Sequence, residues 1–224
     1  TMQGQTLLEL TSETIDGGLT IESESDVRRI VDLTLECINE TYNFGADKRI
    51  WFDKKIGLSY GILAPDDVWH DYPLGVFAFT GANFSYDESA SRLKISAADL
   101  MAFTLQDRGS QIGASEVVIE VDSNIRNAMI ETLKRFTPLV DYAITEFPAD
   151  QQVVPYDVSV DSGAYPHDII KKLRDLYPNY ETYIDAYGTF VCNKIPERTD
   201  DPLFLDETVI DPLIISEQVR TDFN

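Results

Sequence analysis

Two histidines in this sequence each precede an aspartate, at His70-Asp71 and at His167-Asp168. A histidine held by a carboxylate can act as a general base, as it does in hydrolytic triads. Adjacent residues rarely present both side chains to one site, however, and residues 109–113 (GSQIG) lack the Gly-x-Ser-x-Gly pattern of a nucleophile. We therefore expect no catalytic residue at either pair. We also expect His167, near the start of a helix, to be exposed.

Carboxylates gather in three loop-like stretches, and such clusters can bind Ca²⁺ or serve as a glycosidase pair. The spacing of a calcium-binding EF-hand loop is absent from the sequence, and no glycine-rich phosphate-binding loop occurs in it. Solvated loop acids are the simpler interpretation, so we expect neither a metal nor a cofactor. The clusters are Asp66, Asp67 and Asp71; Asp200 and Asp201; and Asp206 and Glu207.

The composition favours a globular protein with a strongly acidic surface. The chain has 224 residues, 43% of them apolar, and a net charge of −21 from 39 acidic and 18 basic residues. Such a surface repels phosphate backbones and anionic lipids, so nucleic-acid and membrane-surface binding are disfavoured. The charge serves solubility, or it forms an acidic face for a basic partner. No apolar run reaches about 18 residues, and no basic segment precedes an apolar one at the N-terminus, so we expect no transmembrane helix and no signal peptide.

The N-terminal half reads as short strands separated by turn signals about every 8–12 residues, which is typical of an antiparallel barrel or sandwich. Its centre is the stretch 68–101. There, an apolar strand at 74–79 and an alternating strand at 92–97 flank a polar turn, and 98–105 forms a short helix. Further strands are expected at 6–10, 19–22, 26–35, 49–52 and 57–63, with a turn at 16–18.

After residue 121 helical and strand-like patterns alternate. Ser123 can cap a helix that Pro138 ends, and a second helix begins near Pro166 and stops before Pro178. Residues 180–195 read as a hairpin, because their central turn has Asp first and Gly last. The predicted fold is α+β: an antiparallel β-barrel over 1–121, an inserted small α/β domain over 122–199, and a return segment over 200–224 with a strand at 213–216.

Two features are candidates for contacts between subunits. Arg28 and Arg29 form a small positive spot in a very acidic chain, as an intramolecular ion-pair site or as part of a subunit contact, where arginine is favoured. Along 56–63, apolar side chains alternate with small residues that include Gly57 and Gly61. One face of that strand is therefore nearly bare, and backbone or a partner should pack closely there.

Tyrosines and cysteines carry weaker signals. The two cysteines, Cys37 and Cys192, are too few for a disulfide framework and are expected to be small buried side chains. The clustered tyrosines serve core and hairpin packing, or they form a face that stacks on sugars or contacts protein. With the loop acids, they leave a cell-wall polysaccharide-degrading enzyme or a carbohydrate-binding protein open as alternatives. They are Tyr177, Tyr180, Tyr183 and Tyr187.

Several stretches combine into a recognisable pattern: 26–29 (DVRR), 49–56 (RIWFDKKI), 72–79 (YPLGVFAF), 95–101 (ISAADLM), 174–178 (RDLYP), 188–190 (GTF) and 214–217 (IISE). Together they resemble baseplate-hub or tail-tip proteins of long-tailed phages and prophages of Gram-positive bacteria. The resemblance covers most of residues 20–224.

This resemblance implies a hub-type β-barrel with an inserted α/β domain, followed by a second barrel that would lie beyond residue 224. It implies a structural component of the virion tail tip, assembled in the host cytoplasm as a trimer at the end of the tail tube, in contact with other tail proteins. The family has no active site in this region, so the resemblance also implies that the chain is not an enzyme. The chain is then expected to be an N-terminal portion of such a protein.

Overall fold

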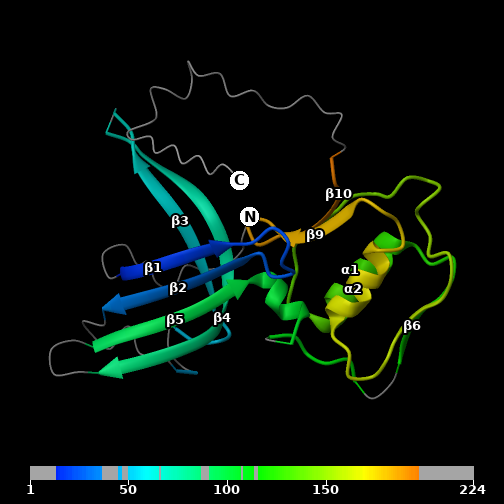
Figure 1. Ribbon diagram of the computed structural model, residues 1–224, viewed down its shortest axis with the longest axis horizontal. Helices are drawn as coiled ribbons and strands as arrows, with labels where there is room; N and C mark the ends of the chain where they lie inside the picture. Colours follow the sequence, from blue (N-terminus) through cyan, green and yellow to red (C-terminus); the bar gives the residue numbers. More distant parts are fainter. Residues whose placement is uncertain are drawn as a thin grey trace, which may run out of the picture. The chain divides into compact units, whose positions relative to one another are not determined.

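Five antiparallel strands form the main sheet, in the order β1-β2-β5-β4-β3, and Figure 1 shows this sheet curling like part of a barrel wall. The computed structural model describes residues 14–36, 45–46, 50–65, 67–86, 91–106, 108–113 and 116–196. The chain divides into two units, Thr1–Lys194 and Ile195–Asn224, and every element named below belongs to the first. The strands are β1 (Thr14–Ile21), β2 (Arg29–Glu36), β3 (Lys55–Leu63), β4 (Trp69–Tyr86) and β5 (Ser91–Asp99).

Strand β4 organises the sheet because its 18 residues have different neighbours along their length. Its first part, Trp69 to Ala78, pairs with β3, and its second part, Phe77 to Tyr86, pairs with β5. The prediction of a strand buried on both faces is confirmed where the two pairings meet, since Val76, Phe77, Ala78 and Phe79 are all buried.

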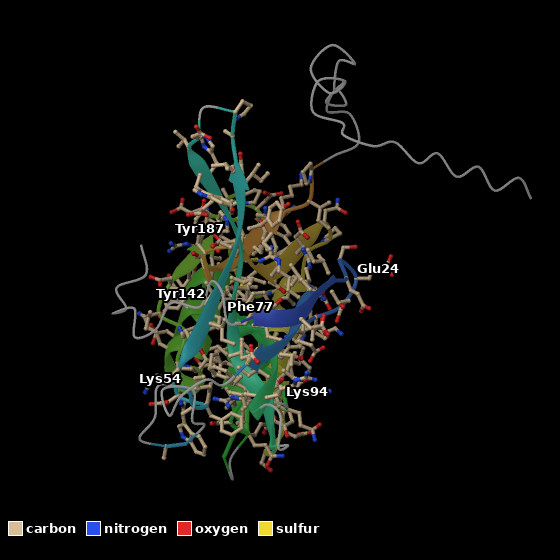
Figure 2. All side chains as sticks on the ribbon, turned by 90° about the vertical axis from the view of Figure 1, so that its left-hand side faces the viewer. Glu24, Lys54, Phe77, Lys94, Tyr142 and Tyr187 are labelled. Atoms are coloured by element: carbon tan, nitrogen blue, oxygen red, sulfur yellow. The ribbon has the colours of Figure 1, made fainter. Side chains whose placement is uncertain are left out.

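The two faces of β4 serve different cores. Phe77 packs with Val31 and Ala97 on one face of the sheet, and Figure 2 shows Phe77 amid the packed side chains, with Glu24, Lys54 and Lys94 at the periphery. Val76 and Ala78, which alternate with Phe77 and so project from the other face, belong to the core of the α/β part. A second cluster on the sheet consists of Leu35, Ile50, Phe79, Leu93 and Ile95.

The α/β part packs two helices against short strands, as Figure 1 shows in green to orange. Its strands form a three-stranded sheet, β7-β10-β9, and a two-stranded sheet, β6-β8. Since β7 pairs with β10 in parallel and β9 pairs with it antiparallel, this small sheet is mixed. The elements are β6 (Val117–Ile119), α1 (Ile125–Phe136), β7 (Tyr142–Ile144), β8 (Val158–Val160), α2 (Pro166–Arg174), β9 (Tyr180–Ile184) and β10 (Phe190–Lys194).

Local sequence signals set the helix ends. The cap of α1 is Asn124, whose side chain accepts the backbone N–H of Asn127, so the predicted cap at Ser123 is wrong by one residue. Helix α2 begins at Pro166 as predicted, and its first turn carries a capping box in which Asp168 accepts the N–H of Tyr165. The predicted hairpin is confirmed as β9 and β10, with Gly188 at a φ of +83° in the turn.

Two other expectations are wrong, and a third is confirmed with narrower bounds. The glycines expected to make a turn at 16–18 lie inside β1, where Gly17 fits under the Leu33 side chain of β2. The expected strand at 49–52 is a turn over its described residues, with a single bridge residue at Ile50. The expected helix at 98–105 is the 3-10 helix η2 (Leu100–Thr104). The strands expected at 6–10 and 213–216 lie outside the described residues.

The buried carboxylate of Asp99 joins three elements at one end of the main sheet. Its Oδ2 accepts the backbone N–H groups of Arg28 (3.0 Å) and Arg29 (3.1 Å), and its Oδ1 accepts that of Met101 (3.0 Å). Burial raises the pKa of Asp99, although the three N–H donors oppose this effect. The carboxylate therefore fixes the start of β2, the end of β5 and the start of η2 relative to one another.

Replacing Gly75 by alanine should lower the free energy of unfolding by about 1–3 kcal/mol, as overpacking usually does. A Cβ at Gly75 would lie 2.7 Å from Cζ of the fully buried Phe77. Gly57→Ala is the matched control, since a Cβ there would meet no heavy atom within 4 Å, and it should be neutral or stabilising by up to about 1 kcal/mol. Urea unfolding measures both. Equal losses of stability in Gly75→Ala and Gly57→Ala would show that contact with Phe77 does not determine the effect of the substitution.

Replacing Phe77 by aspartate should abolish folding, because it buries an unpaired charge.

Replacing Asp99 by alanine should lower the free energy of unfolding by about 2–5 kcal/mol, because it leaves buried N–H groups without an acceptor. Asp185→Ala is the control: Asp185 also accepts two backbone N–H groups, from Tyr187 and Thr189, but in a turn where water can replace it. That control should lose about 1 kcal/mol or less. Similar losses in both variants would contradict the joining role of Asp99.

Candidate assembly surface

The two His-Asp pairs do not form dyads. His70 and Asp71 are successive residues of β4, so their side chains project to opposite faces of the ribbon. His70 pairs with Ile62 of β3, and Asp71 pairs with Gly61. In the second pair, Asp168 is engaged at the start of α2, where its Oδ2 accepts the N–H of Tyr165 at 2.8 Å.

The expectation that His167 is exposed is wrong, because the turn between β1 and β2 covers it. The residue is 4% exposed, and its Nε2 lies 3.3 Å from Oδ2 of Asp26. Neither ring nitrogen makes a hydrogen bond within the described part of the chain. Burial lowers the pKa of His167, Asp26 opposes that shift, and Lys171 and Arg174 reinforce it. His167 is therefore a neutral side chain at the junction between the sheet and the α/β part.

The two candidate arginines are used differently. Arg28 donates from Nη2 to Oε2 of Glu181 at 2.8 Å, and its guanidinium lies 5.0 Å from the centre of the Tyr183 ring. The intramolecular ion pair, one of the two predicted alternatives, is thus present at Arg28 and links the β1–β2 turn to β9. Arg29 begins β2 and is half-buried, and its backbone N–H binds Asp99. A subunit contact at either arginine stays a prediction.

The two candidate glycines lie in β3 in different surroundings. The space above Gly57 is open. A Cβ at Gly61 would lie 3.0 Å from Oδ1 of Asp71 and 3.2 Å from Cε3 of Trp69, so the close packing predicted for this bare strand comes at Gly61 from the neighbouring β4.

Beyond these glycines, β3 and β4 continue as a two-stranded projection, which we call the arm: Ser59 to Leu63 of β3, Trp69 to Pro73 of β4, and the turn between them. Figures 1 and 2 show the arm extending past the rest of the sheet, in cyan. Pairing with β5 begins only at Phe77, so within the described residues the arm has no third strand. Its exposed apolar side chains are Tyr60 (59%), Ile62 (46%), Leu63 (50%), Trp69 (65%) and Tyr72 (53%).

Both faces of the arm carry exposed apolar side chains, and each also carries a polar residue, His70 opposite Ile62 and Asp71 opposite Gly61. Directly opposite residues of an antiparallel pair share a face, so the pair Tyr60 and Tyr72 lies on the same face as Ile62. The pair Leu63 and Trp69 lies on the other face, together with Gly61. Sequence reasoning pointed to β3 through its glycines but missed Trp69 and Tyr72, because the strand was expected to begin only at residue 74.

The four clustered tyrosines do not share one surface. Tyr180 is buried and stacks on Phe147 with ring centres 4.4 Å apart, whereas Tyr183 projects from the other face of β9 towards Arg28. Tyr187 is 68% exposed at the hairpin turn. Of the acidic clusters, Asp67 and Asp71 belong to the arm and its turn, and the other predicted members lie outside the described residues.

Two further observations concern the cysteines and the possible metal ligands. Cys192 is buried, as predicted, and burial raises the pKa of its thiol to about 11; Cys37 lies outside the described residues. No group of three or more potential ligands among the described histidines, cysteines and acids is placed to hold a metal ion. Neither helix in the described part is long and apolar enough to cross a membrane.

Acidification should destabilise the protein partly through His167. The folded-state pKa of His167 lies below its ordinary value of 6.5, so below about pH 6.5 the unfolded chain takes up a proton that the folded chain does not. The resulting loss is at most about 1.4 kcal/mol per pH unit. Urea unfolding at several values between about pH 7.5 and 5.5 should show a flatter slope for His167→Leu than for the unmodified chain. An unchanged slope in His167→Leu would contradict the effect.

Comparison with known proteins gives a structural likeness. No protein-family model matches the sequence, and no curated protein matches it. The structure is similar to a tail protein from Neisseria meningitidis MC58, with a TM-score of 0.50 at 9% identity, covering 78% of this chain and 44% of that one. It is also similar to the 43 kDa tail protein of prophage MuSo2 from Shewanella oneidensis, with a TM-score of 0.52 at 14% identity, covering 80% of this chain and 50% of that one. The matched part thus spans about half the length or less of either protein, and at these identities the likeness is one of fold.

Proposed function

We propose that this chain is a structural protein of a phage or prophage tail, which works by contacts with further copies of itself and with other tail proteins. The observation that carries the proposal is the fold shared with two tail proteins at TM-scores of 0.50 and 0.52. The arm supports it from a different direction. A contiguous apolar surface on a projecting hairpin is typical of a protein–protein contact.

Within the tail, we place the chain at the tip or baseplate hub, as part of a trimer that closes the end of the tail tube. This finer assignment follows the family resemblance in the sequence, which is best at 72–79 and 95–101. It includes a closed hub-type barrel, of which the curled sheet β1-β2-β5-β4-β3 would be one wall. It also includes a virus whose host is a Gram-positive bacterium.

The tail role predicts that the protein is present in purified particles from the strain that encodes it. Mass spectrometry of tails separated from heads should detect the chain, and gold-labelled antibodies against it should bind at the distal end of the tail. An antibody to a capsid protein provides the control for position. Infectious particles without the chain would overturn the structural role, and label along the whole tail would overturn only the tip position.

We also propose that the chain acts without catalysis. The His-Asp pairs diverge, and the tyrosines that could have lined a sugar cleft lie on different surfaces. The purified full chain should therefore leave no clearing in a gel that contains bacterial cell wall, beside a known wall hydrolase as positive control. A cleared band at the mass of the chain, 25.3 kDa, would contradict this and favour the polysaccharide-degrading alternative.

A further inference from the structure

Strand β3 is an edge strand whose only charged residue, Lys55, stands at its start. It ends the sheet order β1-β2-β5-β4-β3, so one side of its backbone has no partner strand among the described residues. Natural edge strands avoid unwanted pairing by charged residues, prolines or bulges. From Ile56 to Leu63, β3 has no charged residue and no proline. The register shift between Leu58 and Ser59 places the extra residue, Leu74, in β4, and therefore β3 itself continues without a bulge.

The other open edges differ from β3. In the arm, β4 carries Asp71 and Pro73, which are both protective. At the far end of the sheet, β1 carries Asp16. Strand β3 has a single charged residue too, Lys55 at its start, but the eight residues that follow, Ile56 to Leu63, have none, and most of them belong to the arm.

From this arrangement we infer that the uncharged edge of β3 and the apolar faces of the arm are covered by a second copy of this chain. This rests on the proposed function only in that a structural subunit must assemble. The edge strand of a neighbouring copy adds to β3 through backbone hydrogen bonds. The side chains of that copy cover Tyr60, Ile62 and Tyr72 on one face of the arm and Leu63 and Trp69 on the other.

Charge favours a second copy over a basic partner. A chain with a net charge of −21 is repelled by its copies at a distance, so copies meet most readily along a strand without acidic residues, such as Ile56 to Leu63, although Asp71 of β4 lies beside Gly61. A basic partner would instead be recognised by acidic side chains along its docking edge, and β3 offers none.

The exposed aromatic side chains supply part of the area that such a contact needs. Tyr60, Trp69 and Tyr72 are each more than half exposed, and aromatic side chains of about 150–250 Å² each then present on the order of 300 Å² together. A specific interface takes about 800 Å² from each partner. Ile62, Leu63 and the backbone edge add to this area, and the rest has to come from the surface next to the arm.

The test uses the purified full chain in sedimentation and light-scattering measurements between about 1 and 100 µM, a range that brackets micromolar dissociation constants. We expect self-association that strengthens as salt is added, because salt screens the repulsion between acidic copies. Ile62→Lys places on β3 the residue that natural edges use against pairing, and it should raise the dissociation constant roughly 10- to 100-fold. Val140→Lys is the matched control. It makes the same change at a 72% exposed residue outside the arm, and it should leave association unchanged.

Hydrogen exchange separates a lost contact from a lost fold. In the unmodified chain, amide protection of β3 should rise with protein concentration. In Ile62→Lys it should stay at its low-concentration value, while protection of α1 and β10 is unchanged. A chain that stays monomeric with unprotected β3 amides, or an Ile62→Lys variant that associates like Val140→Lys, would overturn the inference. If purified particles nevertheless contain the chain, the structural role stands, and another tail protein covers the β3 edge and the arm.

Discussion

The carboxylate of Asp99 is the interaction on which the rest of the structure depends. It is 1% exposed, and it accepts backbone N–H groups from the residues before and at the start of β2 and from the first turn of η2. A buried carboxylate costs desolvation free energy, which is offset only when donors surround it. Its geometry therefore holds the β1–β2 turn against the end of β5. From that turn, Arg28 reaches Glu181 of β9 and Asp26 covers His167 of α2, so the turn that Asp99 positions supplies two contacts with the α/β part.

Strand β4 shows how neighbours, more than residue type, decide the fate of apolar side chains. Val76 to Phe79 lie between β3 and β5 with core on both faces, and they are buried. Trp69 and Tyr72 are just as apolar, but only β3 pairs with them, and more than half of each is exposed. The same strand thus contributes the centre of a core and the side of a projecting arm.

This dependence on neighbours explains what the sequence could and could not predict. Alternation and terminal signals are local, so the helix start at Pro166, the β9–β10 hairpin and the buried run in β4 were predictable. The glycines at 16–18 are a local turn signal, but cross-strand packing of Leu33 on Gly17 places them in a strand. His167 lies in the first helical turn, a usually exposed position, and is buried by Asp26 from a distant turn. The exposure of Trp69 and Tyr72 depends on where β5 ends, which no local pattern contains.

The arm also links stability to assembly. A two-stranded ribbon standing alone is only marginally stable in water, so the tip of the arm has less to hold it than the strands at Phe77. A partner that adds a strand to the β3 edge binds the arm only while β3 and β4 are paired. Its binding therefore stabilises the paired arm by mass action. In the self-association inferred above, copies of this acidic chain would repel one another least along the uncharged run from Ile56 to Leu63. Order in the arm and contact at β3 are in this way two consequences of the same binding equilibrium.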